Sequence, residues 1–282
     1  MTFNMAKVRF LDKRIRKIFS GYTSTISTAF SLILIFLTIP ADHKIRYGIL
    51  FILSLLILYV ILWIRSNDLN EVSLDIEGST VTVKTGDLFE QEGFKVIAFN
   101  EYFDTQVDDV VISRNSLNGI YINHYLSSSI PNLDAAIKEY NHDECCVLSV
   151  NHERKSGKQQ RYALGTIFVN DEYLLTAFSK FDAHNQAYLT MPDYLGFLIN
   201  FWDQINRIYA QKCVSVPIFG SGITRFKEHK NIGDEELLKI MLWTFRISEM
   251  RFKYPAKLTI VIHKDKIDQI NLLDIKSARN GL

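Results

Sequence analysis

The chain has 282 residues and a formal net charge of +1, which allows one sizeable domain and an appendage. The charge is unevenly divided: residues 1–66 hold nine Lys or Arg against two Asp, and the remainder holds 23 against 29 Asp or Glu. A basic start and a mildly acidic remainder argue against nucleic acid as the main partner.

Two uncharged, apolar segments, residues 18–41 and 47–64, follow the basic segment 1–17. As helices, both are long enough to cross a hydrocarbon core of about 30 Å, the second only just. Only a short turn separates them, which a cleaved signal peptide would not show. We therefore predict a hairpin of two transmembrane helices, at about 20–40 and 47–64.

Positive charge predicts the orientation of this hairpin. Six Lys or Arg precede the first span, whereas the turn between the spans carries only Lys44 and Arg46. The positive-inside rule places the N-terminus in the cytoplasm, and two spans return the chain to the same side. We therefore expect a multi-pass protein in the lipid bilayer with both termini cytoplasmic.

Five hydroxyl residues form a stripe along the first span: Ser20, Ser24, Ser27, Ser31 and Thr38. Small hydroxyl residues let helices approach closely and hydrogen-bond across the contact. Alternatively, each hydroxyl bonds a carbonyl of its own helix. Self-association in the membrane is the hypothesis that follows.

A polar linker over 65–71 precedes residues 72–282, which have the pattern of an α/β domain with a mixed sheet. Early strands followed by alternating strands and helices are typical of this class, whose ligands bind at the carboxyl ends of strands. We expect strands at 72–76, 81–83, 95–99, 161–169, 172–178, 214–217 and 257–262, and helices at 132–140 (with Asn132 as a cap), 191–210, 234–248 and from 265.

The segment Thr85-Gly86-Asp87-Leu88-Phe89 ends a strand with a carboxylate. Asp87 is placed to accept a hydrogen bond from an adenine amino group, with the Leu88 amide nearby. The alternative is an Asx turn, the usual role of Gly-Asp after a strand.

The strand at 214–217 runs into a loop of small residues, Gly220-Ser221-Gly222-Ile223-Thr224. Glycine permits backbone N–H groups to turn inward around a diphosphate; an ordinary tight loop is the alternative. Arg225 is either a counter-charge for phosphate or a solvated side chain. Phe226 either lies against a ribose or base or belongs to the core.

In order and spacing, residues 85–89, 96–100 and 220–223 resemble the ADP-ribose-binding macro domain, and so a three-layer α/β/α sandwich. Asn100-Glu101-Tyr102-Phe103-Asp104-Thr105, with Ser116-Leu117-Asn118-Gly119 downstream, is similar to the macro-domain subgroup of Thoeris anti-phage effectors, which also carry two membrane spans first. The resemblance covers nearly the whole chain.

The resemblance implies that Asp87 recognises adenine, that Asn100 approaches the distal part of the ligand, and that residues 220–224 hold the diphosphate. Glu101 and Asp104 are candidates for meeting a group attached beyond the ribose. The full set of candidate ligand-binding residues is Asp87, Leu88, Asn100, Glu101, Phe103, Asp104, Asn118, Gly119, Gly220, Ser221, Gly222, Ile223, Thr224, Arg225 and Phe226. No metal and no cofactor is expected.

For such effectors the resemblance implies signal reception without catalysis. A TIR-domain partner enzyme converts NAD into an ADP-ribose conjugate, here one with histidine. The macro domain binds it, the protein forms homo-oligomers, and the spans disrupt the bacterial inner membrane, which kills the cell.

Two other readings stay open: a membrane-tethered ADP-ribosyl or O-acyl-ADP-ribose hydrolase with Asp104 or Asp87 as base, and a passive scaffold for ADP-ribosylated proteins. The residues from Glu101 to Thr105 stand where many macro domains have a second Asn and three glycines, and Arg225 stands where glycine is usual. These departures argue against hydrolysis.

Overall fold

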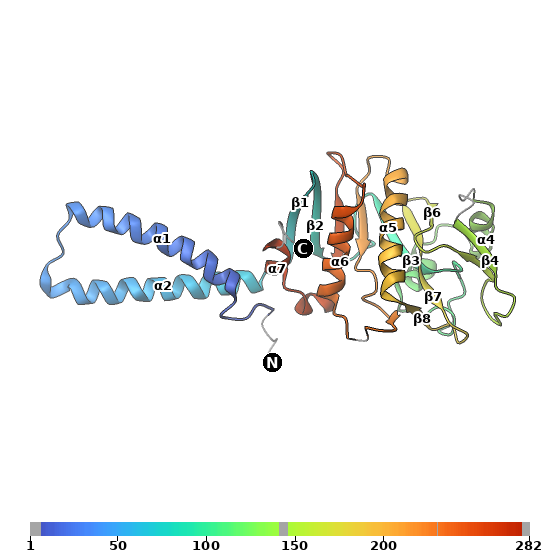
Figure 1. Ribbon diagram of the computed structural model, residues 1–282, viewed down its shortest axis with the longest axis horizontal. Coiled ribbons are helices and arrows are strands. Elements are labelled where there is room, and N and C mark those ends of the chain that lie inside the picture. The colour runs from blue at the N-terminus through green and yellow to red at the C-terminus, as the bar shows by residue number, and fades with distance from the viewer. Residues whose placement is uncertain (1–6, 141–145, 230, 278–282) are drawn as a thin grey trace.

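The computed structural model describes residues 7–140, 146–229 and 231–277. Its N-terminal part is a helical hairpin that projects from the rest of the molecule (Figure 1). Helix α1 is Lys13–Phe36, α2 is Lys44–Asn67, and a 3-10 turn, Ala41–His43, joins them. The first helix ends before the expected residue 40, so Thr38 lies beyond it, and the second is longer than expected at both ends.

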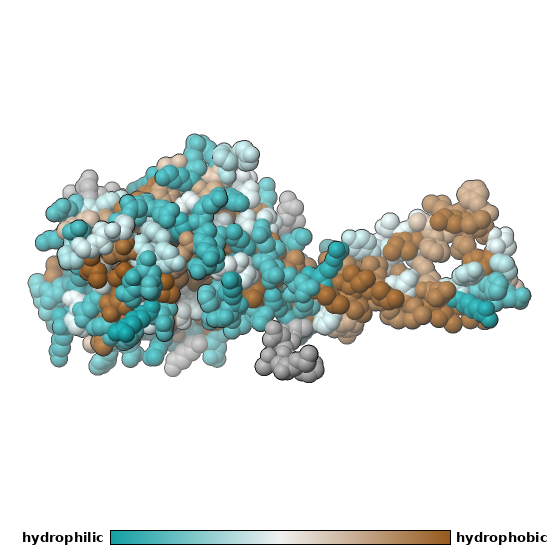
Figure 2. All heavy atoms as spheres, turned by 180° about the vertical axis from the view of Figure 1, so that it is seen from behind, coloured by the Kyte–Doolittle hydropathy of each residue, from teal (hydrophilic) through white to brown (hydrophobic). Residues whose placement is uncertain are grey.

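Both hairpin helices are long and apolar enough to cross a membrane, by length and composition. Almost none of either is buried. The hairpin exposes large apolar side chains such as Phe36 and Ile45, which are 86% and 77% exposed. Hydrophobic residues cover much of its surface in Figure 2. An exposed apolar surface of this extent marks an interaction site.

The sheet of the domain has the strand order β1-β2-β11-β9-β3-β7-β8-β10, and β6 pairs with β7. The pairs β1–β2, β6–β7 and β7–β8 are antiparallel and the others parallel, so the predicted mixed sheet is confirmed. The strands are β1 Glu71–Ile76, β2 Ser79–Thr85, β3 Phe94–Asn100, β6 Ile167–Asn170, β7 Tyr173–Phe181, β8 Ala187–Leu189, β9 Val214–Pro217, β10 Arg225–Phe226 and β11 Leu258–Ile262.

Helices cover both faces of the sheet (Figure 1). Along β3, Val96 packs in the core cluster under α5 and α6, whereas Ile97 and Phe99 pack in the cluster with η2 and α4. The alternation follows from the period of two in a strand, and it gives the predicted three layers. The helices are α3 Leu117–Ile120, η2 Tyr121–Tyr125, α4 Ile130–Glu139, α5 Met191–Ile208, α6 Asp234–Ile247, η4 Lys264–Gln269 and α7 Leu272–Ser277.

A capping box begins α5. The Thr190 hydroxyl accepts from the Asp193 N–H at 3.2 Å, and the Asp193 carboxylate accepts from the Thr190 N–H at 3.3 Å. Burial raises the pKa of the Asp193 carboxyl, but hydrogen bonds from Lys180 and Thr190 outweigh it and hold that pKa below its usual value. The box fixes the start of the helix that covers the sheet beside β9.

Two element predictions need correction here, and three short strands were not expected. Ser129, not Asn132, caps α4, because its hydroxyl accepts from the Asn132 N–H. The single strand expected at 161–169 is two strands, β5 Gln160–Tyr162 and β6, separated at Gly165, whose φ is +92°. The short strands β8, β10 and β4 (Val147–Val150) were not expected; β4 pairs with β5 outside the main sheet.

Candidate functional site

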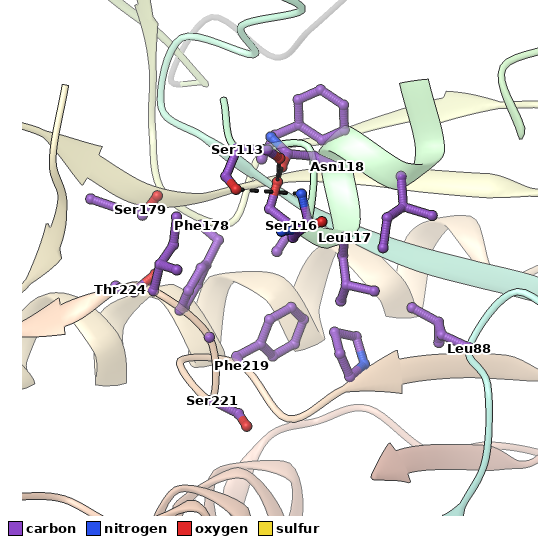
Figure 3. A pocket seen from close by; sticks show the side chains of 18 of the residues that line it. Leu88, Ser113, Ser116, Leu117, Asn118, Phe178, Ser179, Phe219, Ser221 and Thr224 are labelled. Atoms are coloured by element: carbon purple, nitrogen blue, oxygen red, sulfur yellow. Dashed lines mark hydrogen bonds between the residues drawn. The ribbon is translucent and has the colours of Figure 1, made fainter. Parts of the chain in front are cut away.

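A cavity of about 490 Å³ lies at the carboxyl ends of β2, β11, β9 and β3 (Figure 3). The chain between β9 and β10 must cross the ends of β3, β7 and β8, because those strands lie between β9 and β10 in the sheet. This crossing forms one wall. Nine candidate residues line the cavity: Asp87, Leu88, Asn100, Asn118, Gly220, Ser221, Gly222, Ile223 and Thr224.

The crossing loop is fixed from behind. Gly220 has φ +89°, and a Cβ there would come within 2.9 Å of the Phe226 ring. The buried Tyr194 hydroxyl donates to the Phe219 carbonyl at 3.0 Å, and burial raises the Tyr194 pKa. The backbone therefore holds a shape that only glycine adopts without strain at position 220.

Asp87 lies in the part of the cavity wall that directly follows β2, and it forms an Asx turn. Its Oδ1 accepts from the Phe89 N–H at 2.9 Å, and its carbonyl accepts from Gln91 Nε2 at 2.5 Å. The turn leaves the negative charge among the lining residues. An Asx turn and adenine recognition are thus compatible, and adenine recognition stays a prediction.

The facing wall comes from the segment that follows β3, and Figure 3 shows Ser113, Ser116 and Asn118 grouped across the cavity from Phe219 and Ser221. Asn118 Oδ1 accepts from Ser116 Oγ at 2.5 Å and from the Gly119 N–H at 3.0 Å. Gly119 itself lies outside the lining. A Cβ on it would meet the Ser113 carbonyl at 2.2 Å, so its role here is close packing of this wall.

Just before this wall, Asp108 holds the turn that leads into it. Its Oδ1 accepts from the N–H groups of Val111 at 2.7 Å and Val110 at 2.9 Å. The bond from Val111, helped by the one from Val110, lowers the pKa of Asp108. The turn delivers Val111 to the lining.

Asn100 is oriented by Asp104, which lies outside the cavity lining. Its Nδ2 donates to Asp104 Oδ2 at 2.9 Å, while its Oδ1 accepts from the Tyr102 N–H. Asp104 is fully buried and paired with Arg154 at 2.5 Å, and the Arg154 guanidinium stacks 3.9 Å from the Tyr102 ring centre. Asp104 is therefore placed to position Asn100 and is screened from acting as a base.

Glu101 and Phe103 also lie outside the lining. Glu101 is buried and accepts from Arg161 Nε and Nη2 at 3.0 and 2.9 Å. The hydrogen bonds that Arg161 donates to Glu101 raise the Arg161 pKa. Phe103 is fully buried, with its ring edge-on to Tyr162. Contact of these residues with a ligand stays a prediction.

The last two candidates follow the crossing loop, where the structure has strand β10 rather than a helix-compatible stretch. Arg225 Nη1 donates to Gln186 Oε1 at 3.0 Å. Phe226 is buried with its ring edge-on to Tyr194, 5.2 Å between centres. Neither lines the cavity, and the core interpretation of Phe226 agrees with its burial.

Several lining residues were not among the candidates. Phe89 and Tyr125 stack in parallel with ring centres 4.0 Å apart, and both line the cavity with His263 and Lys266. His263 follows β11 directly, so the rule that ligands sit at the carboxyl ends of strands points to it. In the part of the chain that the structure describes, no group of three or more His, Cys, Asp or Glu is arranged to hold a metal ion.

Comparisons with known proteins agree with these motifs. Residues 81–263 match the family described as "Thoeris protein ThsA, Macro domain". The chain is 41% identical over 276 residues to the Thoeris protein ThsA of Bacillus amyloliquefaciens (strain Y2), covering 96% of this chain and 92% of that protein.

Solved structures similar to the chain include the Oceanobacillus iheyensis macrodomain with MES bound, at 15% identity and a TM-score of 0.42, covering 74% of this chain and 94% of that one. The same macrodomain with ADP has 14% identity, a TM-score of 0.42 and the same coverage. On the family match and the 41% identical relative, the chain belongs to the Thoeris ThsA family of macro-domain proteins, which act in anti-phage defence.

Proposed function

We propose that the chain is a membrane-anchored receptor and effector. Its domain, residues 72–282, binds an ADP-ribose-derived signal without turning it over, and the hairpin carries the response into the bacterial inner membrane. Both termini lie in the cytoplasm, as the six cations before the first span favour. The observation that carries the proposal is the glycine-containing loop crossing the ends of β3, β7 and β8 above a 490 Å³ cavity.

The signal we propose is a histidine–ADP-ribose conjugate, made from NAD by a TIR-domain partner. Support comes from the arrangement of the lining: a carboxylate at Asp87, small residues at 220–222, and Asn100 held in one orientation by Asp104. The family model covers this region. The conjugate is long and anionic, and the lining extends from β2 across to β7.

Binding drives homo-oligomerisation and membrane disruption in this proposal. A ligand shifts such an equilibrium only by binding the assembled state more tightly, and about 5.5 kcal/mol of differential affinity takes it from 1:99 to 99:1. The exposed apolar surface of the hairpin supplies the part that acts on the bilayer.

The first experiment is calorimetric titration of the full chain in lipid nanodiscs with ADP-ribose and with its histidine conjugate, followed by chromatographic recovery of the ligand. We expect intact conjugate and tighter binding of it than of ADP-ribose. Recovery of cleaved ligand would replace the proposal with a hydrolase. Absence of binding by both compounds would remove the receptor function.

The variant Asp87→Asn tests the adenine contact. Asparagine keeps an Oδ1 for the Phe89 N–H and so keeps the Asx turn, but loses the charge. A charge-assisted hydrogen bond is worth about 1.5–3 kcal/mol, so we expect ADP-ribose affinity to fall about 10- to 100-fold at an unchanged unfolding temperature. Wild-type affinity in this variant would assign Asp87 to the turn alone.

A further inference from the structure

One short segment joins the cavity to the base of the hairpin. We call residues 263–277, which contain η4 and α7, the connector. At one end His263 and Lys266 line the cavity. At the other end Leu273 packs with Val8 and Ile15 in a small apolar cluster beneath the hairpin. Figure 1 shows α7 at the side of the domain from which the hairpin projects.

Between its two ends the connector is held in the main core. Ile270 and Ile275 are fully buried, and Ile267 and Leu272 belong to the same cluster. Packed side chains of this kind transmit displacement because interiors are close-packed. The cavity end and the hairpin end are therefore parts of one packed element.

At the hairpin end, charged groups clasp the first helix to the domain. Asp274 accepts from Arg14 of α1 through Oδ1 and from Lys239 of α6 through Oδ2, the latter at 2.6 Å. Lys239 also donates to Glu235 at 2.6 Å, and Glu235 Oε2 accepts from the Asn271 N–H at 2.8 Å. We call Arg14, Asp274, Lys239 and Glu235 the clasp.

At the cavity end, the same turn of α6 is engaged. Lys266 Nζ lies 3.3 Å from Oδ2 of Asp234, the first residue of α6. Asp234 is 7% exposed, and among the described residues this oxygen has no hydrogen-bond partner, so the ion pair with Lys266 is the contact recorded for it. Asp234 thus contacts Lys266, which lines the cavity, while the adjacent Glu235 belongs to the clasp.

We propose that the connector and the first turn of α6 couple occupancy of the cavity to the placement of the hairpin, with the pair Arg14–Asp274 as the joint. The inference rests on the proposed function, since it takes an ADP-ribose compound as the ligand. Coupling between two sites is reciprocal: if the ligand alters the joint, breaking the joint alters ligand affinity.

The test uses the full chain in nanodiscs and ADP-ribose as the probe. The variants are Arg14→Gln, Asp274→Asn and the pair together, with Arg16→Gln as the control, because Arg16 is exposed on the same helix turn. We expect both single variants and the double variant to change the dissociation constant by one common factor of about five or more, and the control to keep wild-type affinity. Unfolding temperatures without ligand identify any variant that fails to fold.

A second measurement needs only the wild type. Hydrogen exchange of residues 7–15 and 271–277 is expected to change when ADP-ribose is added, although neither Arg14 nor Asp274 lines the cavity. Wild-type affinity in folded Arg14→Gln and Asp274→Asn proteins, or unchanged exchange at saturating ligand, would overturn the coupling and leave the receptor function standing. Failure of the wild type to bind ADP-ribose or its conjugate would remove both proposals.

Discussion

At the scale of single residues, Gly220 and Gly222 occupy the same loop under different constraints. Gly220 has φ +89° and faces the Phe226 ring, whereas a Cβ on Gly222 would meet nothing within 4 Å. Substituting each glycine in turn therefore tests whether the stability of the crossing loop depends on the positive φ at position 220 or only on small side chains.

We expect Gly220→Ala to lower the free energy of unfolding by about 1–3 kcal/mol, because alanine is strained at this φ. Gly222→Ala is expected to leave it within about 0.5 kcal/mol of wild type. Thermal unfolding of both variants, beside ADP-ribose titration, measures the difference. Equal stability of the two would show that the loop relaxes freely at position 220.

At the scale of elements, the capping box makes α5 sensitive to one hydroxyl. Thr190→Ala leaves the Asp193 N–H without its side-chain acceptor, and such a loss costs about 0.5–2 kcal/mol. We expect a lower unfolding temperature, measured by circular dichroism, and recovery in Thr190→Ser, which keeps the hydroxyl. A Thr190→Ala protein as stable as wild type would show that packing alone sets the helix start.

Elements with their own local signals could be predicted from sequence. Strand β9 was expected at its observed bounds, 214–217, because two valines alternate with a serine before a proline. Helix α5 carries both periodicity and Pro192 near its start. Strands β8 and β10 are two or three residues long, and all of β4 is exposed, so these three strands carry no alternation that a pattern could detect.

The same distinction applies to the candidate site: residues with a local sequence signal were predicted, and those without one were not. The crossing loop was predicted because its glycines indicate, within a few residues, a backbone conformation that other residues adopt only with strain. The surroundings of Asp104 and Glu101 were not found, because their partners Arg154 and Arg161 lie 50 and 60 residues away. The sequence spacing of two residues so far apart does not predict that they form an ion pair, because only the folded sheet brings them together.

At the scale of the whole molecule, the hydroxyl stripe of α1 bears on assembly. Ser24 and Ser31 are exposed on the hairpin, whereas Thr25 and Thr28 donate to the carbonyls of Gly21 and Ser24 in their own helix. Local bonding thus occurs at two threonines that lie outside the predicted stripe, and for the stripe itself self-association stays a prediction. Its exposed members Ser24 and Ser31 present small side chains on the surface of the hairpin.

We expect the double variant Ser24→Leu, Ser31→Leu to weaken oligomers formed with ADP-ribose in detergent, because leucine keeps helix backbones apart. Light scattering after size-exclusion chromatography measures the oligomer mass. Ser54→Leu on α2 is the control, since its hydroxyl donates to the Phe51 carbonyl of its own helix. Unchanged mass in the double variant would exclude the stripe as the contact.

The place of β11 in the sheet has a consequence for how the protein is made. Of the strands in the described residues, β11 is the last to leave the ribosome, yet it lies between β2 and β9. The hairpin precedes the domain in the chain, so it is translated while the domain still lacks this strand. Until residues 258–262 emerge, β2 and β9 have no partner between them and the cavity has no complete wall. A chain that terminates before β11 therefore contains the whole hairpin but an incomplete cavity, and we expect such a chain not to bind ADP-ribose.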